Sequence, residues 1–168
     1  HWSTIEYFYR LSWERADPSV RGDFHDWAVT ADLRTYVRLA RRQSVWLRVL
    51  GGAGHGRAGD GTQLAAQRRY VLGGVGTLRG QNFKSLEGNR VALANLEYVF
   101  GVSKSLSALF LVDAGTAWDE GSLFSQRIRV DVGTGIRLGE GGVSVALAKN
   151  INDTDSDVKV VLRLEDTF

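Results

Sequence analysis

The chain has 168 residues, of which 43% are hydrophobic and 24% charged, and this composition fits one folded domain rather than a disordered segment. Its 21 basic and 19 acidic side chains leave a net charge of +2, which indicates no nucleic-acid partner. No stretch reaches the roughly 18 consecutive apolar residues that a membrane-spanning helix needs, so a helical membrane protein is excluded. The absence of cysteine excludes a disulfide framework and a thiolate metal site.

Apolar and polar residues alternate along most of the chain. In the first run Ile5, Tyr7 and Tyr9 share one face, whereas Glu6 and Arg10 share the other. The same period of two recurs in seven later segments, and no long helix is needed to account for the sequence. We therefore predict an all-β chain with eight strands, at residues 2–14, 25–39, 44–56, 90–101, 106–118, 126–138, 142–150 and 157–168.

The predicted connections alternate between long and short. The longer ones are residues 15–24, 57–89, 119–125 and 151–156, and the tight ones are 40–43, 102–105 and 139–141. Outer-membrane barrels show this asymmetry, with short periplasmic turns and longer external loops. Aromatic residues also gather at strand ends, as in two interfacial belts, although aromatics end strands in other sheets as well. They are Trp13, Trp27, Trp118 and Phe124 toward the long loops, and Trp2, Tyr98, Phe100 and Phe168 toward the short turns.

The direction in which each face points separates two classes of barrel. A soluble barrel turns its charged face outward, whereas a membrane barrel turns that face into the lumen. Here the polar face mixes charged residues with Gly51, Gly115, Gly133 and Gly135, as expected where charges pair across a lumen and a loop approaches the wall. We therefore predict an antiparallel transmembrane β-barrel. A soluble ligand-binding β-barrel is the competing class, and detergent-dependent solubility distinguishes the two.

The sequence contains no complete motif for a dinucleotide, metal or hydrolase site. The glycine-rich segment 73–80 lacks the G-x-G-x-x-G spacing and the following helix of a dinucleotide site. The three histidines are scattered along the chain, which argues against a metal site. The Asp-x-Asp-x-Asp run at 153–157 lacks the glycine and the distant glutamate of a calcium loop, so an exposed hairpin tip is the better interpretation. No nucleophile elbow is present. We therefore expect no cofactor, no metal site and no enzymatic activity.

Several motifs in one order carry a family resemblance. They are Leu72-Gly73-Gly74-Val75-Gly76-Thr77-Leu78-Arg79-Gly80, Gly88-Asn89-Arg90, Asn95-Leu96-Glu97-Tyr98, Phe110-Leu111-Val112-Asp113-Ala114-Gly115 and the terminal Phe168. Together they resemble the C-terminal half of the barrel in the BamA and TamA superfamily, also called the bacterial surface antigen family. These proteins insert or translocate proteins at the bacterial outer membrane. The resemblance covers nearly the whole chain.

The resemblance implies that the loop at 57–89 folds back into the lumen through a Val-Arg-Gly-Phe or Tyr motif. The matching residues here are Leu78, Arg79, Gly80 and Gln81, and the last departs from the family's aromatic residue. It further implies that Glu97 and Asp113 hold Arg79. Strand parity supports this, because both acids lie on the polar faces of strands joined by a tight turn, where a guanidinium between them forms charge-assisted hydrogen bonds.

The resemblance also implies a location and partners. The final strand, with Val158, Val160, Leu162, Leu164 and Phe168, is expected to form a C-terminal strand signal with the C-terminus in the periplasm. The expected partners are outer-membrane lipids and unfolded client proteins, which pair with an unsealed strand edge. An alternative within the superfamily is a secretion pore or a platform for partner subunits.

Residues 1–168 are thus expected to be a single barrel segment that forms half of a larger barrel. Family barrels have sixteen strands, and the five predicted strands after the Arg79 loop match their last five. An eight-stranded barrel has an interior just filled by side chains, which leaves no room for the loop at 57–89. The other strands would come from a second copy, another chain or an upstream segment, and the start at His1 and the absence of methionine are compatible with a truncated or split chain.

Overall fold

A computed structural model of the chain describes residues 4–16, 26–56, 63–139 and 142–164. The predicted all-β class and the eight antiparallel strands are confirmed. In spatial order the sheet contains β1 (Ile5–Ala16), β2 (Asp26–Ala40), β3 (Gln43–His55), β6 (Arg90–Gly101), β7 (Leu106–Trp118), β8 (Arg129–Leu138), β9 (Val143–Asn150) and β10 (Lys159–Leu164). Of the residues described, none belongs to a helix that is long and apolar enough to cross a membrane.

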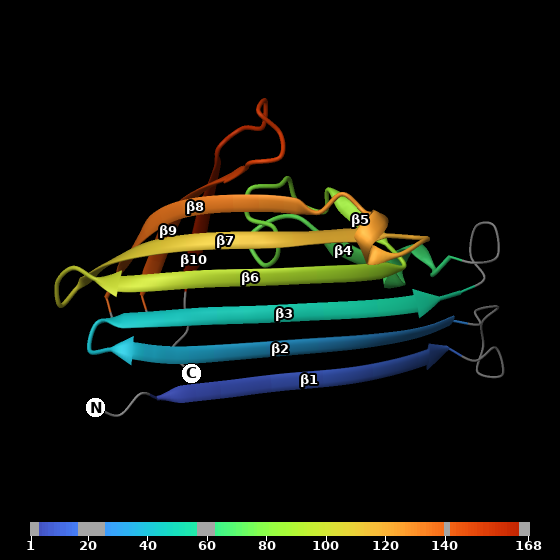
Figure 1. Cartoon of the computed structure of the whole chain (residues 1–168), viewed down its shortest axis with the longest axis horizontal. Coiled ribbons are helices and arrows are strands. Elements are labelled where there is room, and N and C mark those ends of the chain that lie inside the picture. Colours follow the sequence, from blue (N-terminus) through green and yellow to red (C-terminus); the bar gives the residue numbers. More distant parts are fainter. Residues whose placement is uncertain (1–3, 17–25, 57–62, 140–141, 165–168) are drawn as a thin grey trace.

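A second, two-stranded sheet lies within the long connection between β3 and β6. It pairs β4 (Tyr70–Leu72) with β5 (Leu86–Gly88), and a single 3-10 turn at Ala66–Arg68 precedes it. Figure 1 shows the main sheet with the short β2–β3 and β6–β7 turns together at one end. The strands β4 and β5 lie toward the opposite end.

Most strand boundaries lie within three residues of those predicted, and Trp2 and Phe168 fall outside the described residues. The strand predicted at 126–138 begins only at Arg129. The preceding residues form a 3-10 turn at Leu123–Ser125, in which the Ser122 hydroxyl accepts a hydrogen bond from the Phe124 N–H. The Gln126 amide donates to the carbonyls of Glu120 and Ser122, so this loop satisfies its own polar groups instead of extending the ladder.

The sheet is strongly curved, as one long-range contact demonstrates. Glu97 on β6 and Arg163 on β10 are four strands apart, which corresponds to about 19 Å in a flat sheet. In the structure the Arg163 guanidinium lies 2.9 Å from the Glu97 carboxylate. The face that carries Glu97 is therefore the inside of the curve, and it is called the inner face below. Among the described residues β1 and β10 pair with one neighbour each, so the sheet is not closed into a barrel.

Small residues on the inner face permit this curvature. A Cβ atom at Gly135 would lie 2.7 Å from the Ala146 Cβ, and one at Gly133 would lie 3.0 Å from the Leu111 side chain. Leu111 belongs to a buried apolar cluster inside the curve that comprises Val99, Leu109, Leu111, Ala146, Ala148 and Val161. The strands can therefore bend around this cluster because β8 contributes almost no side-chain volume to it.

The outer face is apolar and exposed. It presents Tyr9, Leu33, Leu96, Ile136 and Leu162, each at least 42% exposed, and similar residues on every other strand. Gly51, which we expected on the polar face, lies on this outer face, because it is in phase with Leu47 and Val49 and pairs with Ala31. The inner face is also less uniformly polar than expected, since Val91, Leu93 and Leu109 are buried there. They are covered by the long loop and by the curvature of the sheet.

Candidate functional site

The loop between β4 and β5 makes a tight turn that delivers its tip to the inner face. Gly73 and Gly74 have φ angles of 112° and 99°, in the left-handed region that favours glycine. The Thr77 hydroxyl accepts a hydrogen bond from the Gly73 N–H at 2.8 Å, and the Gly74 N–H donates to the Leu78 carbonyl at 3.0 Å. Leu78 is fully buried against Leu72, Val91 and Leu93. The glycines thus fix the turn, and Leu78 secures it by apolar contact.

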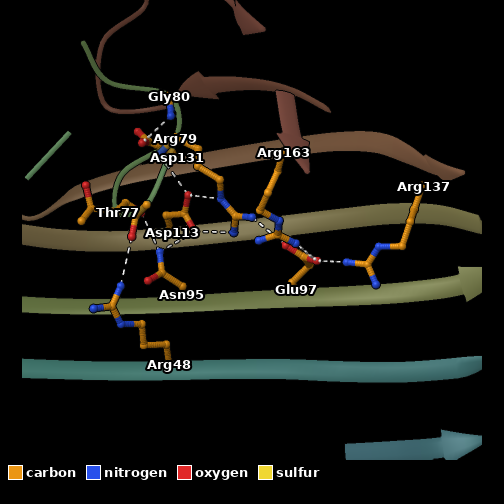
Figure 2. A network of polar contacts seen from close by, with 11 residues as sticks. Arg48, Thr77, Arg79, Gly80, Asn95, Glu97, Asp113, Asp131, Arg137 and Arg163 are labelled. Carbon is orange, nitrogen blue, oxygen red and sulfur yellow. Dashed lines mark hydrogen bonds and ion pairs between the residues drawn. The ribbon is translucent and has the colours of Figure 1, made fainter. Parts of the chain in front are cut away.

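Arg79, the next residue, is held by two carboxylates of the sheet (Figure 2). Its Nε and Nη2 atoms donate to the two oxygens of Asp113 at 2.8 and 2.7 Å, and Nη1 donates to Glu97 at 2.7 Å. The Arg79 backbone N–H adds a bond to Asp113 at 3.1 Å. All three residues are at most 7% exposed. The bidentate geometry and the burial are typical of a strong, charge-assisted contact, here between the loop and the sheet.

The second oxygen of Glu97 connects this contact to two more strands. Arg137 on β8 donates to it at 2.8 Å, and Arg163 on β10 at 2.9 Å. We call Arg79, Glu97, Asp113, Arg137 and Arg163 the Arg79 cluster. Both of its carboxylates have arginine partners, as buried charges require. One glutamate therefore fastens β8 and β10 to β6 while it also binds the loop.

The electrostatics favour a permanently charged guanidinium. Burial alone lowers the pKa of Arg79, but its hydrogen bonds and charge contacts with Asp113 and Glu97 outweigh burial. The pKa of Arg79 therefore lies above its usual value. The site acts as a fixed ionic attachment and not as a group that gains and loses a proton.

Gly80 and Gln81 attach to Asp131 on β8, a residue that the sequence analysis did not single out. Asp131 is fully buried and accepts bonds from the Gly80 N–H at 2.7 Å and the Gln81 side-chain amide at 3.2 Å. Asn150 on β9 donates to the same carboxylate at 2.9 Å. Gln81, which stands where the family has an aromatic residue, thus makes a polar contact with the wall. Asp131 is paired with Asp113 across β7 and β8, so both side chains lie on the same face of the sheet. In the sequence, the position of Asp131 on the polar face of its strand was the signal that could have identified it as a site residue.

Arg48 and Asn95 hold the other side of the loop tip; the sequence analysis did not single out Arg48, and it named Asn95 within a motif without giving it a role. The Asn95 amide donates to the Thr77 carbonyl at 2.6 Å and to Asp113 at 2.8 Å. Arg48 on β3 donates to the Gly76 carbonyl at 3.0 Å and binds Asp32 on β2 through two hydrogen bonds of 3.0 Å. The contacts of Asp32 and Arg48 extend the polar attachment of the loop to β2 and β3.

A third attachment lies nearer the base of the loop. The Tyr70 hydroxyl lies 2.8 Å from Thr30 Oγ1 and donates to the Val29 carbonyl at 2.9 Å. A Cβ atom at Gly52 would lie 2.7 Å from the Tyr70 ring, so glycine is required there for the ring to reach β2. Tyr70 therefore places β4 against the inner face before the chain reaches the tip.

The residues of the expected C-terminal signal do not join this site. Val160, Leu162 and Leu164 lie on the outer face of β10, each at least 59% exposed, and Val158 is exposed just before the strand. Phe168 lies outside the described residues. Arg163, on the opposite face of the same strand, belongs to the Arg79 cluster instead. Within the described parts of the chain no group of His, Asp and Glu residues is arranged to hold a metal ion.

The fold and the site define an all-β protein with a curved antiparallel sheet and a loop fixed inside the curve by a buried arginine. The family model of the Omp85 superfamily domain matches residues 2–163. The chain therefore belongs to the Omp85 superfamily, a superfamily of protein insertion and translocation that is associated with the bacterial outer membrane. The resemblance to BamA and TamA is confirmed by this match. A search of curated proteins gave no match.

Replacement of Arg79 by alanine is expected to lower the free energy of unfolding by about 3–5 kcal/mol, because it leaves two buried carboxylates without their shared cation. Fluorescence of the five tryptophans during unfolding in detergent measures this change. Arg15→Ala, on the exposed end of β1, is the matched control. Adding Glu97→Gln and Asp113→Asn to Arg79→Ala should recover part of the loss, and an additive further loss would contradict the ionic explanation.

Gly80 and Gly76 provide a matched pair for the approach of the loop to the wall. A Cβ at Gly80 would lie 2.7 Å from the Lys149 carbonyl carbon and 2.8 Å from the Asn150 nitrogen, whereas one at Gly76 meets nothing within 4 Å. Gly80→Ala should therefore cost about 1–3 kcal/mol and expose the loop to protease, with Gly76→Ala nearly neutral. Equal effects of the two variants in unfolding and limited proteolysis would show that the close approach is unimportant.

Proposed function

We propose that this chain is part of an outer-membrane β-barrel that inserts or translocates client proteins. The outer face of the sheet contacts lipid, and the Arg79 loop lies in the lumen. One observation carries the proposal: the exposed outer face is apolar, whereas buried acids such as Glu97, Asp113 and Asp131 lie on the inner face. Membership of the Omp85 superfamily supports the same conclusion.

The competing soluble barrel fits this arrangement poorly. A soluble barrel fills its interior with apolar side chains and turns charges toward water. Here the edge strand β1 exposes Tyr7, Tyr9, Leu11 and Trp13 by 67–82%. An apolar surface that extends over all eight strands is far larger than the patches that soluble monomers tolerate.

The lengths of most strands, though not of β9 and β10 as described, are consistent with a membrane position. A tilted strand needs about 9–11 residues to cross the hydrocarbon. β2, β3 and β7 have 15, 13 and 13 residues, and β6 has 12. The longer loops at 56–89, 119–128 and 151–158 follow one end of the strands and the short turns follow the other. With the short turns in the periplasm, the C-terminus after β10 also lies on the periplasmic side.

The mechanism we propose is templating at an open strand edge. β1 and β10 each have only one partner strand among the described residues, so one side of each backbone is available for new hydrogen bonds. An incoming unfolded segment pairs with such an edge and becomes a strand. During this exchange the Arg79 cluster ties β6, β7, β8 and β10 to the loop, which preserves the curvature of the wall while an edge is occupied.

Additional strands complete the barrel in this proposal. Hydrocarbon does not tolerate open sheet edges, because each unpaired backbone group costs several kcal/mol. The loop already occupies the inside of the curve, so closure between β1 and β10 of the same sheet would leave little room for it. A second copy, another chain or a further segment of the same protein can supply these strands.

Labels on two adjacent residues of β8 test the orientation of the sheet. Val130 is in phase with the outer face and Arg129 with the inner face, and the chain has no cysteine to interfere with labelling. In reconstituted vesicles a spin label at Val130→Cys should collide mainly with oxygen dissolved in lipid. A label at Arg129→Cys should collide with a water-soluble nickel chelate. The reverse assignment would overturn the membrane proposal.

A cross-linking experiment tests closure. Tyr9→Cys on β1 and Leu162→Cys on β10, both on the outer face, should not be joined within one chain by a short bismaleimide in detergent. Leu47→Cys and Leu96→Cys form the positive control, because these residues are paired across β3 and β6. An internal cross-link between β1 and β10 as efficient as the control would contradict the larger barrel, and covalent dimers would identify a second copy as the source of the strands.

A further inference from the structure

Three basic side chains lie on two neighbouring short turns. Arg41 and Arg42 connect β2 to β3, Lys104 lies in the β6–β7 turn, and all three are exposed. The turns are side by side, since the Gly101 N–H donates to the Arg42 carbonyl at 2.7 Å and a Cβ at Gly101 would lie 3.0 Å from the Arg42 Cβ. We call Arg41, Arg42 and Lys104 the basic rim. Arg38, at the end of β2, adds a fourth exposed positive charge nearby.

The two turns that carry the basic rim contain no acidic residue. Segments 36–44 and 98–109 contain no acidic residue, and within the described residues no member of the rim forms an ion pair. Of the described acids, Glu6 on β1 lies at the short-turn end, whereas Glu140, Glu165 and Asp166 are outside the described residues. At the long-loop end some basic groups are neutralised, as in the pairs Arg69–Asp119 and Lys159–Asp157. Other exposed basic groups of that end, such as Arg15, Arg90 and Arg127, form no ion pair among the described residues, so the basic rim is distinguished by the absence of acids from its own turns.

Exposed apolar side chains adjoin the basic rim. Leu39, Phe100 and Val102 are 56%, 41% and 56% exposed, and each lies within two residues of a turn or within it. They continue the apolar outer face up to the level of the cations. An apolar surface that ends at a row of cations matches the chemistry of a phospholipid, in which acyl chains end at a phosphate.

We propose that the basic rim binds the phosphate groups of anionic phospholipids in the leaflet at the short-turn end. The proposal rests on the membrane position given under the proposed function. An acidic protein would also be attracted to the cations, but it offers no reason for the apolar surface to continue up to them. The rim would hold the short-turn end at the headgroup level and set the depth of the sheet in the bilayer.

The test uses the full chain in vesicles of zwitterionic phosphatidylcholine with 0 or 30% phosphatidylglycerol. A spin-labelled phosphatidylglycerol reports how much lipid is motionally restricted by the protein, compared with spin-labelled phosphatidylcholine. The rim variant is Arg41→Gln, Arg42→Gln and Lys104→Gln. We expect a selectivity of severalfold for phosphatidylglycerol in the wild-type chain at low salt, which the rim variant and 0.5 M salt both reduce to nearly one.

Arg15→Gln, Arg90→Gln and Arg127→Gln form the control, because they remove the same number of exposed charges from the long-loop end. This control should retain the selectivity of the wild-type chain, and an equal loss in both variants would show nonspecific attraction and overturn the proposal. Stronger binding of polyglutamate than of phosphatidylglycerol by the rim would identify a protein site instead. Flotation of the vesicles shows whether the chain has inserted. A chain that does not insert contradicts the proposed function, whereas an inserted chain without lipid selectivity contradicts only the proposal that the basic rim binds anionic phospholipids.

Discussion

The salt bridge of Arg79 with Asp113 and Glu97 is the contact on which the rest of the structure depends. Buried carboxylates on a sheet are destabilising unless a cation compensates them, and here the cation comes from a loop. The acids hold the tip of the loop in place. In return, Arg79 of the loop allows the two carboxylates to stay ionised although they are buried away from water. Because Glu97 also binds Arg137 and Arg163, the same group transmits this mutual dependence to the curvature of the sheet.

Much of the fold could be predicted from the sequence, because alternation identifies a strand and its two faces without any tertiary information. The contacts of Arg79 with Glu97 and Asp113 were implied by the family resemblance, and parity supported them by placing both acids on one face. Asp131, Arg48 and Asn95 were not assigned to the site because their contacts with the loop are to its backbone groups or to a side-chain amide. Such contacts depend on where a loop lies, and strand periodicity carries no information about that.

The inner face shows where binary patterning misleads. Val99, Leu109 and Leu111 are apolar residues on the inner face, which was expected to be polar. Gly51, expected on that face, lies on the outer face instead. A flat sheet would expose these inner residues to water, but the curvature brings them together with Ala146 and Val161. Curvature itself depends on the small residues of β8 and β9, whose significance emerges only when neighbouring strands are in place.

The bond between Arg163 and Glu97 has a consequence for the order of folding. It joins residues 66 positions apart, and its basic partner belongs to the last strand of the described sheet. Contacts of such high sequence separation form late, because the entropy of closing a long loop must be overcome first. As the sheet forms, β2, β3, β6 and β7 can each pair with the preceding strand of the sheet, yet Glu97 gains its full set of arginines only after β10 is in place. The pairing of β10 is therefore the step that completes the curvature of strands that have formed earlier.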